Sequence, residues 1–155
     1  MPRMELIAGD AREILAILGA GPDADIDAVR DRFVARIRLG GGMDPTWLDL
    51  FAESVRVAAE TDGPTDFIDA RIALGAEDEA LTIERVDPAW ISAVARLPDG
   101  RVDAVAGRWI DRLEEELGAL PREEKPWIRQ LAGQVVAFCR DADRAPDVVF
   151  VWSLA

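Results

Sequence analysis

The sequence from Asp147 to Leu154 reads DVVFVWSL, and this stretch decides the predicted fold. Its consecutive β-branched and aromatic residues are typical of a strand that lies in the middle of a sheet and is buried on both faces. A second short apolar run, Met4 to Ala8, predicts a strand near the other end of the chain. Helical patterns dominate the sequence between these runs. The sequence therefore predicts an α+β fold, a helix-rich domain with a small sheet that includes the N- and C-terminal strands.

The intervening helices are marked by capping residues and by apolar side chains at helical spacing. The predicted helices follow Asp10, Pro22, Asp44, Asp87, Gly100 and Pro121. We expect the helix after Pro22 to continue to the glycines at 40–42, because Ile26, Val29, Phe33 and Ile37 recur at helical intervals. The last predicted helix has the clearest buried stripe. Its members are Ile128, Leu131, Val135, Phe138 and Ala142.

The region from Thr61 to Ala80 is the hardest to interpret. Gly63 and Pro64 interrupt the chain, and the apolar residues up to position 80 fit either a short helix or irregular packing. From Leu81 to Val86, apolar and polar residues alternate, which predicts a half-buried or edge strand.

An Asp-Pro-x-Trp-aliphatic pattern occurs twice, at Asp44 to Leu48 and at Asp87 to Ile91. It could mark a duplicated unit, although the flanking segments match poorly. We prefer the interpretation that both are helix starts, because aspartate caps a helix and proline is tolerated in the first turn. In that case the two tryptophans point into the core.

The length of 155 residues and the apolar content of 50% predict a single domain, residues 1–155, with one core. Cys139 is the only cysteine, so no disulfide can form within the chain. We find neither a secretory leader nor a membrane span in the sequence and expect a soluble, cytoplasmic protein. Abundant alanine, glycine, aspartate and arginine point to a GC-rich bacterial genome.

The net charge of −12 argues against nucleic acid and anionic membranes as partners, because both carry negative charge. The chain also lacks histidine and tyrosine, which removes the commonest general base and zinc ligand. Any catalysis would rest on carboxylates, Ser, Thr, Lys125 or Cys139. We expect no cofactor.

An acidic segment is the main candidate for chemistry. Nine acidic residues and two arginines lie between Glu60 and Asp87. Carboxylates from this segment could gather around Mg²⁺, which prefers oxygen ligands, although charge runs are usually solvated surfaces. The candidate metal-binding or catalytic residues are Asp66, Asp69, Glu77, Asp78, Glu79 and Glu84.

Other charged or reactive residues have plainer interpretations. Asp23, Asp25 and Asp27 resemble the start of a calcium loop, but the later glycine and glutamate are missing, so we interpret them as helix-start residues. Cys139 has no histidine to activate it and should be a buried, inert thiol. The glycines at 40–42 lack the residues of a phosphate loop. The arginines Arg30, Arg32, Arg36 and Arg38 could hold a phosphate or a partner's carboxylate, but we favour a surface neutralised by nearby acids.

The second half of the chain carries a family resemblance. Ala73-Leu74-Gly75 is followed by an acidic run, and Val86-Asp87-Pro88 leads into a helix. After an acid-rich segment, the last helix leads to the strand at 148–154. In this order and spacing the sequence resembles the YfbM-like family of small, uncharacterised bacterial proteins. The resemblance implies a mixed α and β fold and transfers no catalytic residue. The chain departs from that family in its Trp-rich ending and in lacking histidine and tyrosine.

Two functions remain open at this point. The first is a non-enzymatic protein-interaction module that neutralises or regulates a basic protein, such as a nuclease toxin, because opposite potentials speed association. The alternative is a carboxylate-based enzyme or a divalent-metal-binding protein that uses the acidic segment at 60–87. Either could be a homodimer, formed by pairing of the strand at 81–86 and of surface tryptophans across a twofold axis.

Overall fold

A computed structural model describes residues 3–19, 33–40, 43–60, 67–68, 70–74 and 82–153 of the chain. In these residues five strands form one antiparallel sheet in the order β2-β1-β5-β4-β3. The strands are β1 (Arg3–Gly9), β2 (Ala35–Leu39), β3 (Arg71–Ala73), β4 (Thr82–Val86) and β5 (Asp147–Ser153). The predicted α+β fold, with strands from both ends of the chain in the sheet, is confirmed.

Strand β5 occupies the centre of the sheet, as its composition predicts. It pairs with β1 on one side and with β4 on the other. The residues from Val148 to Val151 are all buried, so both faces of this strand lie in the protein interior. A continuous apolar run is therefore needed here, because alternate residues point to opposite faces of a strand.

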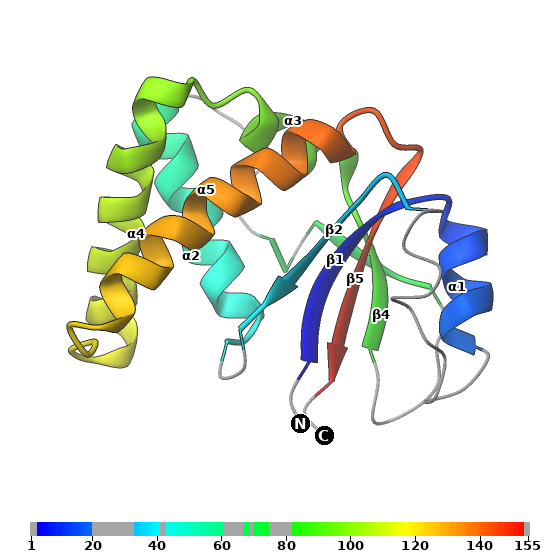
Figure 1. Ribbon diagram of the computed structural model, residues 1–155, viewed down its shortest axis with the longest axis horizontal. Coiled ribbons are helices and arrows are strands. Elements are labelled where there is room, and N and C mark those ends of the chain that lie inside the picture. The colour runs from blue at the N-terminus through cyan, green and yellow to red at the C-terminus, as the bar shows by residue number, and fades with distance from the viewer. Residues whose placement is uncertain are drawn as a thin grey trace.

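Helices cover both faces of the sheet. The helices are α1 (Ala11–Gly19), α2 (Pro45–Ala59), α3 (Pro88–Ala95), α4 (Val102–Leu117) and α5 (Glu124–Ala142), with a short 3₁₀ helix at Asp99–Arg101 before α4. Figure 1 shows α1 on one side of the sheet and the other four helices on the opposite side. Two separate groups of buried residues result: Leu6 and Phe150 belong to the larger group under α2–α5, and Ile7 and Val149 to the smaller group under α1.

The two Asp-Pro-x-Trp segments start α2 and α3, as the capping interpretation predicts. The Asp44 carboxylate accepts a hydrogen bond from the backbone N–H of Thr46, and the Asp87 carboxylate accepts one from Ala89, each at 2.8 Å. Trp47 and Trp90 are both buried. The repeat is thus explained by helix capping followed by an inward tryptophan.

The prediction of a helix from Pro22 to the glycines at 40–42 is wrong where it can be checked. Residues 35–39 form β2, and the first part of the predicted helix lies outside the described residues. The error has a simple cause: Phe33 and Ile37 are four residues apart, a spacing that puts two side chains on one face of a helix and also on one face of a strand. Within β2, Ile37 and Leu39 are buried and Arg38 is exposed, which is a strand pattern.

The strand predicted at 81–86 forms as β4 (Thr82–Val86), but it does not lie at an edge. It has β5 on one side and β3 on the other. The short strand β3, which lies in a region expected to be helical or irregular, is the neighbour that covers the outer side of β4. The edge strands of the described sheet are β3 and β2, and β3 covers β4 from Glu84 to Val86.

Candidate functional site

An open groove of about 500 Å³ runs between the edge strand β2 and helix α5. One long side of β2 pairs with β1, and no other strand of the described sheet covers its opposite side. The groove is lined by Val34, Ala35, Arg36, Ile37, Arg38, Gln134, Ala137, Phe138 and Asp141. Figure 1 shows α5 passing beside β2 at this margin of the sheet. The groove is therefore a hollow that combines a strand edge with a helix surface.

Helix α5 has two faces that explain its position. One face carries the predicted stripe from Ile128 to Ala142, which is buried in the larger core. The other face carries Trp127, Gln134 and Asp141, which are exposed and follow one another at intervals of seven residues, close to two helical turns. This exposed stripe contributes the helical wall of the groove and extends beyond it to Trp127.

A buried carboxylate supports the strand side of the groove. Glu5 on β1 is only 1% exposed, and its Oε1 accepts hydrogen bonds from Arg36 Nη2 at 2.5 Å and from Arg38 Nε at 3.1 Å. The antiparallel register places Glu5 directly opposite Arg38. A buried carboxylate is costly unless cations accompany it, so this arrangement fixes β2 against β1. Arg36 is largely covered, whereas the side chain of Arg38 is 67% exposed.

Trp127 lies against Gly40 at the end of β2. A Cβ atom at position 40 would come within 2.6 Å of the Trp127 ring, so only glycine leaves room for the indole there. The ring is nevertheless 39% exposed. An aromatic side chain that is half packed and half accessible is a common anchor in protein interfaces.

Carboxylates flank both ends of the exposed stripe on α5. At one end Asp141 pairs with Arg144 at 3.7 Å, and both side chains are largely exposed, so this pair holds Asp141 weakly. At the other end Glu123 and Glu124 precede Trp127 by four and three residues and share its helix face. The exposed stripe on α5 thus has carboxylates at each end, of which Asp141 lines the groove, and Arg38 lies on the opposite wall.

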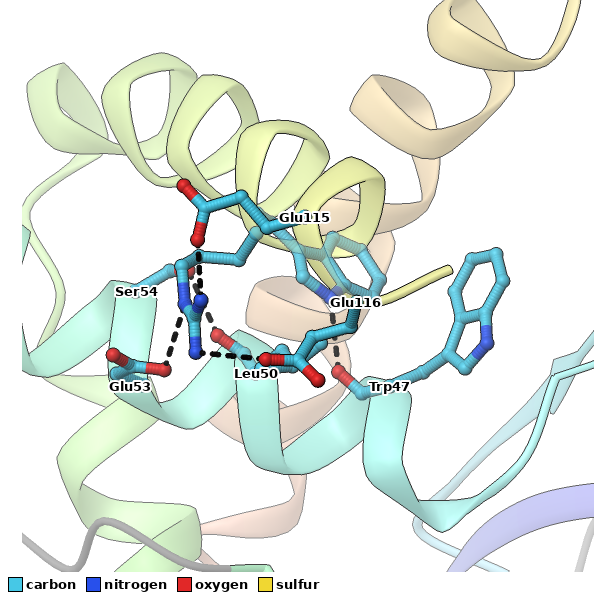
Figure 2. A network of polar contacts seen from close by, with 8 residues as sticks. Trp47, Leu50, Glu53, Ser54, Glu115 and Glu116 are labelled. Atoms are coloured by element: carbon cyan, nitrogen blue, oxygen red, sulfur yellow. Dashed lines mark hydrogen bonds and ion pairs between the residues drawn. The ribbon is translucent and has the colours of Figure 1, made fainter. Parts of the chain in front are cut away.

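A second polar network joins α2 to α4 and is drawn in Figure 2. The guanidinium of Arg112 reaches Glu53 on α2 at 3.2 Å and, on its own helix, Glu115 at 2.5 Å and Glu116 at 3.6 Å. Hydrogen bonding to Glu115 and then to Glu53 raises the pKa of Arg112 above its ordinary value. Beneath it the Trp109 indole N–H donates to the Trp47 carbonyl at 2.9 Å. The network fastens two helices together, and we assign it a structural role.

The sequence-predicted acidic candidates fall mostly outside the described residues. Asp66, Asp69, Glu77, Asp78 and Glu79 all lie there. Glu84 is described, and its carboxylate pairs with Arg71 of the neighbouring strand β3 at 2.9 Å. The Arg71 guanidinium also stacks over the rings of Phe67 and Phe150, with its central carbon 5.4 and 5.1 Å from their centroids. In the described part of the chain, no three acidic or cysteine residues group as metal ligands would.

The other reactive candidates take structural positions. Cys139 is buried in α5, and desolvation together with the nearby Asp143 raises the pKa of its thiol. Arg36 and Arg38 pair with Glu5 of β1, while Arg30, Arg32 and the aspartates near them in sequence lie outside the described residues. Sequence reasoning missed the groove, because the helix predicted over 35–39 concealed the strand edge. The alternation of Arg36, Ile37, Arg38 and Leu39 was the signal that could have revealed it.

Comparisons of the chain with protein-family models, with curated proteins and with solved structures gave no match. Among the described helices, none has the length and apolar character needed to cross a bilayer.

Proposed function

We propose that this protein is a non-enzymatic interaction module that binds a basic protein partner through the groove between β2 and α5. The observation that carries the proposal is the groove itself: a strand edge faces an exposed helix stripe, with an accessible tryptophan beyond one end. Strand edges and aromatic anchors are recurrent elements of protein recognition. We further propose that the protein acts in the cytoplasm and is a distant member of the YfbM-like family.

Charge supports a basic partner. The net charge of −12 attracts cations over a distance, and opposite potentials raise the rate of association. The carboxylates at the two ends of the exposed α5 stripe would orient an approaching basic partner toward the groove. Neutralisation or regulation of a basic protein is the role that this combination fits best.

Site-specific photocrosslinking tests the proposal. Benzoylphenylalanine replaces Ala137, which lies in the groove, and in a matched protein it replaces Ala104, which is exposed on α4. We expect a discrete adduct with a basic protein from position 137 only. The crosslinked protein is then identified and purified, and its binding should weaken with the groove variant Asp141→Asn and with rising salt.

The proposal fails if position 137 gives no adduct, or if both positions give the same set of adducts. It also fails if the crosslinked protein is a second copy of this chain, since the groove would then hold a homodimer contact.

A further inference from the structure

We propose that the groove, together with the exposed α5 stripe that extends beyond it to Trp127, recognises an extended segment of the partner that carries two cationic residues about six positions apart, one stacked on Trp127 and the other paired with Asp141. This inference rests on the proposed function and specifies its ligand. It follows from three properties of the exposed α5 stripe: its length, its aromatic end and its charges.

The spacing comes from the geometry of α5. Trp127 and Asp141 are fourteen residues apart on one face of the helix. At 1.5 Å per residue their backbone positions are separated by about 21 Å. An extended chain advances about 3.3 Å per residue, so about six residues of the partner span this distance. A helical segment would need about fourteen residues for the same span.

An extended conformation suits the other wall of the groove. That wall is β2, whose side away from β1 has no strand neighbour in the described sheet. Helix α5 begins beside Gly40, where Trp127 makes contact, and its residue Asp141 lies in the groove with Val34. The strand and the helix therefore run along the groove in opposite directions, and a segment bound between them follows both.

The chemistry at each end selects a cation. The Trp127 ring is 39% exposed, an accessible indole can bind a guanidinium or ammonium group by cation–π attraction, and Glu123 and Glu124 lie four and three residues before it. Nearby Lys125 is held by Glu114 at 3.2 Å. At the other end, the ion pair that Asp141 makes within the described residues is the exposed one with Arg144, which a bound cation can replace. Between the ends Arg38 is 67% exposed, so the middle of the segment should be uncharged.

A synthetic peptide tests this specificity. The probe has seven residues, with arginine at both ends and alternating valine and threonine between them. The comparison peptide has the same composition with its two arginines adjacent in the centre. By isothermal titration calorimetry at low salt, we expect the first peptide to bind with a Kd at least about tenfold lower than the second, because cation–π and ion-pair contacts of this kind each contribute severalfold.

Variants of the protein assign the contacts. Trp127→Ala and Asp141→Asn should each weaken binding of the first peptide by about three- to tenfold. The matched controls Leu117→Ala and Asp111→Asn alter exposed residues of α4 and should leave its Kd unchanged. Equal thermal midpoints for all four variants would show that each one folds.

The results separate this inference from the proposed function. Equal binding of the two peptides, binding that the α4 variants weaken as much as the groove variants do, or no binding at all overturns the inference. If the Ala137 crosslink still captures a basic protein in any of these cases, the proposed function stands and only the ligand pattern is wrong. If both experiments fail, the groove is not a docking site for basic segments.

Discussion

Glu5 shows how a single residue can fix the edge of a sheet. Its buried carboxylate accepts hydrogen bonds from Arg36 and Arg38, and all three side chains belong to neighbouring strands. Strand β2 has a strand neighbour only on one side of the described sheet, so this ion cluster adds to the pairing with β1 that holds it. The groove depends on this cluster because β2 forms one of its walls.

Replacing Glu5 with glutamine should destabilise the fold. The largely covered Arg36 guanidinium would lose its buried counter-charge, and breaking such a pair costs about 3 kcal/mol. Urea denaturation followed by circular dichroism measures this free energy of unfolding. The control Glu13→Gln alters an exposed residue in the first turn of α1 and should cost less than about 1 kcal/mol. Similar losses for both variants would show that the Glu5 cluster contributes nothing specific.

Gly40 should be intolerant of a side chain. In Gly40→Ala the new Cβ would meet the Trp127 ring at 2.6 Å, so the indole must move, and overpacking of this kind costs about 1–3 kcal/mol. Gly133→Ala is the matched control in α5, because a Cβ there meets nothing within 4 Å and alanine favours a helix by about 0.5–1 kcal/mol. Thermal unfolding of both variants measures the difference. A stable Gly40→Ala protein would contradict the contact with Trp127.

Cys139 should resist modification while the protein is folded. Burial raises the pKa of its thiol, so the reactive thiolate remains scarce at pH 8, where an ordinary cysteine is partly ionised. Ellman's reagent should therefore react slowly with the native protein and rapidly after unfolding in guanidinium chloride. Stoichiometric reaction of the native protein within minutes would refute this assignment.

At the scale of secondary structure, Arg112 links α4 to α2 through three carboxylates. Arg112→Met should lower the thermal midpoint, because Glu115 and Glu116 would face Glu53 without a cation between them. The loss should shrink in about 1 M NaCl, where the Debye length falls to about 3 Å. Differential scanning calorimetry at low and high salt provides the measurement. A loss that salt does not change would contradict this electrostatic role of Arg112.

The helices and strands that the sequence predicts correctly have strong local signals. Strand β5 is marked by its unbroken apolar run, and α2 and α3 by an aspartate cap before proline. Strand β2 is mispredicted because Phe33 and Ile37 fit both periodicities over so few residues. The short β3 exists through its pairing with β4, which is a contact between segments and leaves little trace in local composition.

The candidate site was harder to predict than the fold, for a physical reason. The groove combines β2 with α5, which lie about ninety residues apart in the chain and meet only through the packing of the larger core. Its residues are ordinary surface types, including alanine, glutamine and arginine, so their composition shows nothing unusual. The sequence pointed instead to the acidic segment at 60–87, but Glu84, the candidate residue of that segment that the structure describes, forms an ion pair with Arg71.

At the scale of the whole molecule, the proposed function combines a negative net charge with a groove that continues into an exposed helix stripe. In the function proposed above, the charge of −12 would attract basic proteins, and the groove between β2 and α5 would give them a shaped surface on which to dock. Because exposed charges are screened by salt, the association rate of a basic partner should fall as ionic strength rises. The central claim is that the groove, and not charge alone, determines where the partner binds.

Amide chemical-shift mapping tests that claim most directly. The ¹⁵N-labelled protein is titrated with the seven-residue peptide that carries an arginine at each end. We expect the largest shifts at residues 34–40 of the β2 margin and along the exposed face of α5 from Trp127 to Asp141. Shifts centred instead on the acidic run from Glu114 to Glu116, or spread evenly over the surface, would show that the peptide follows charge alone and would contradict the account.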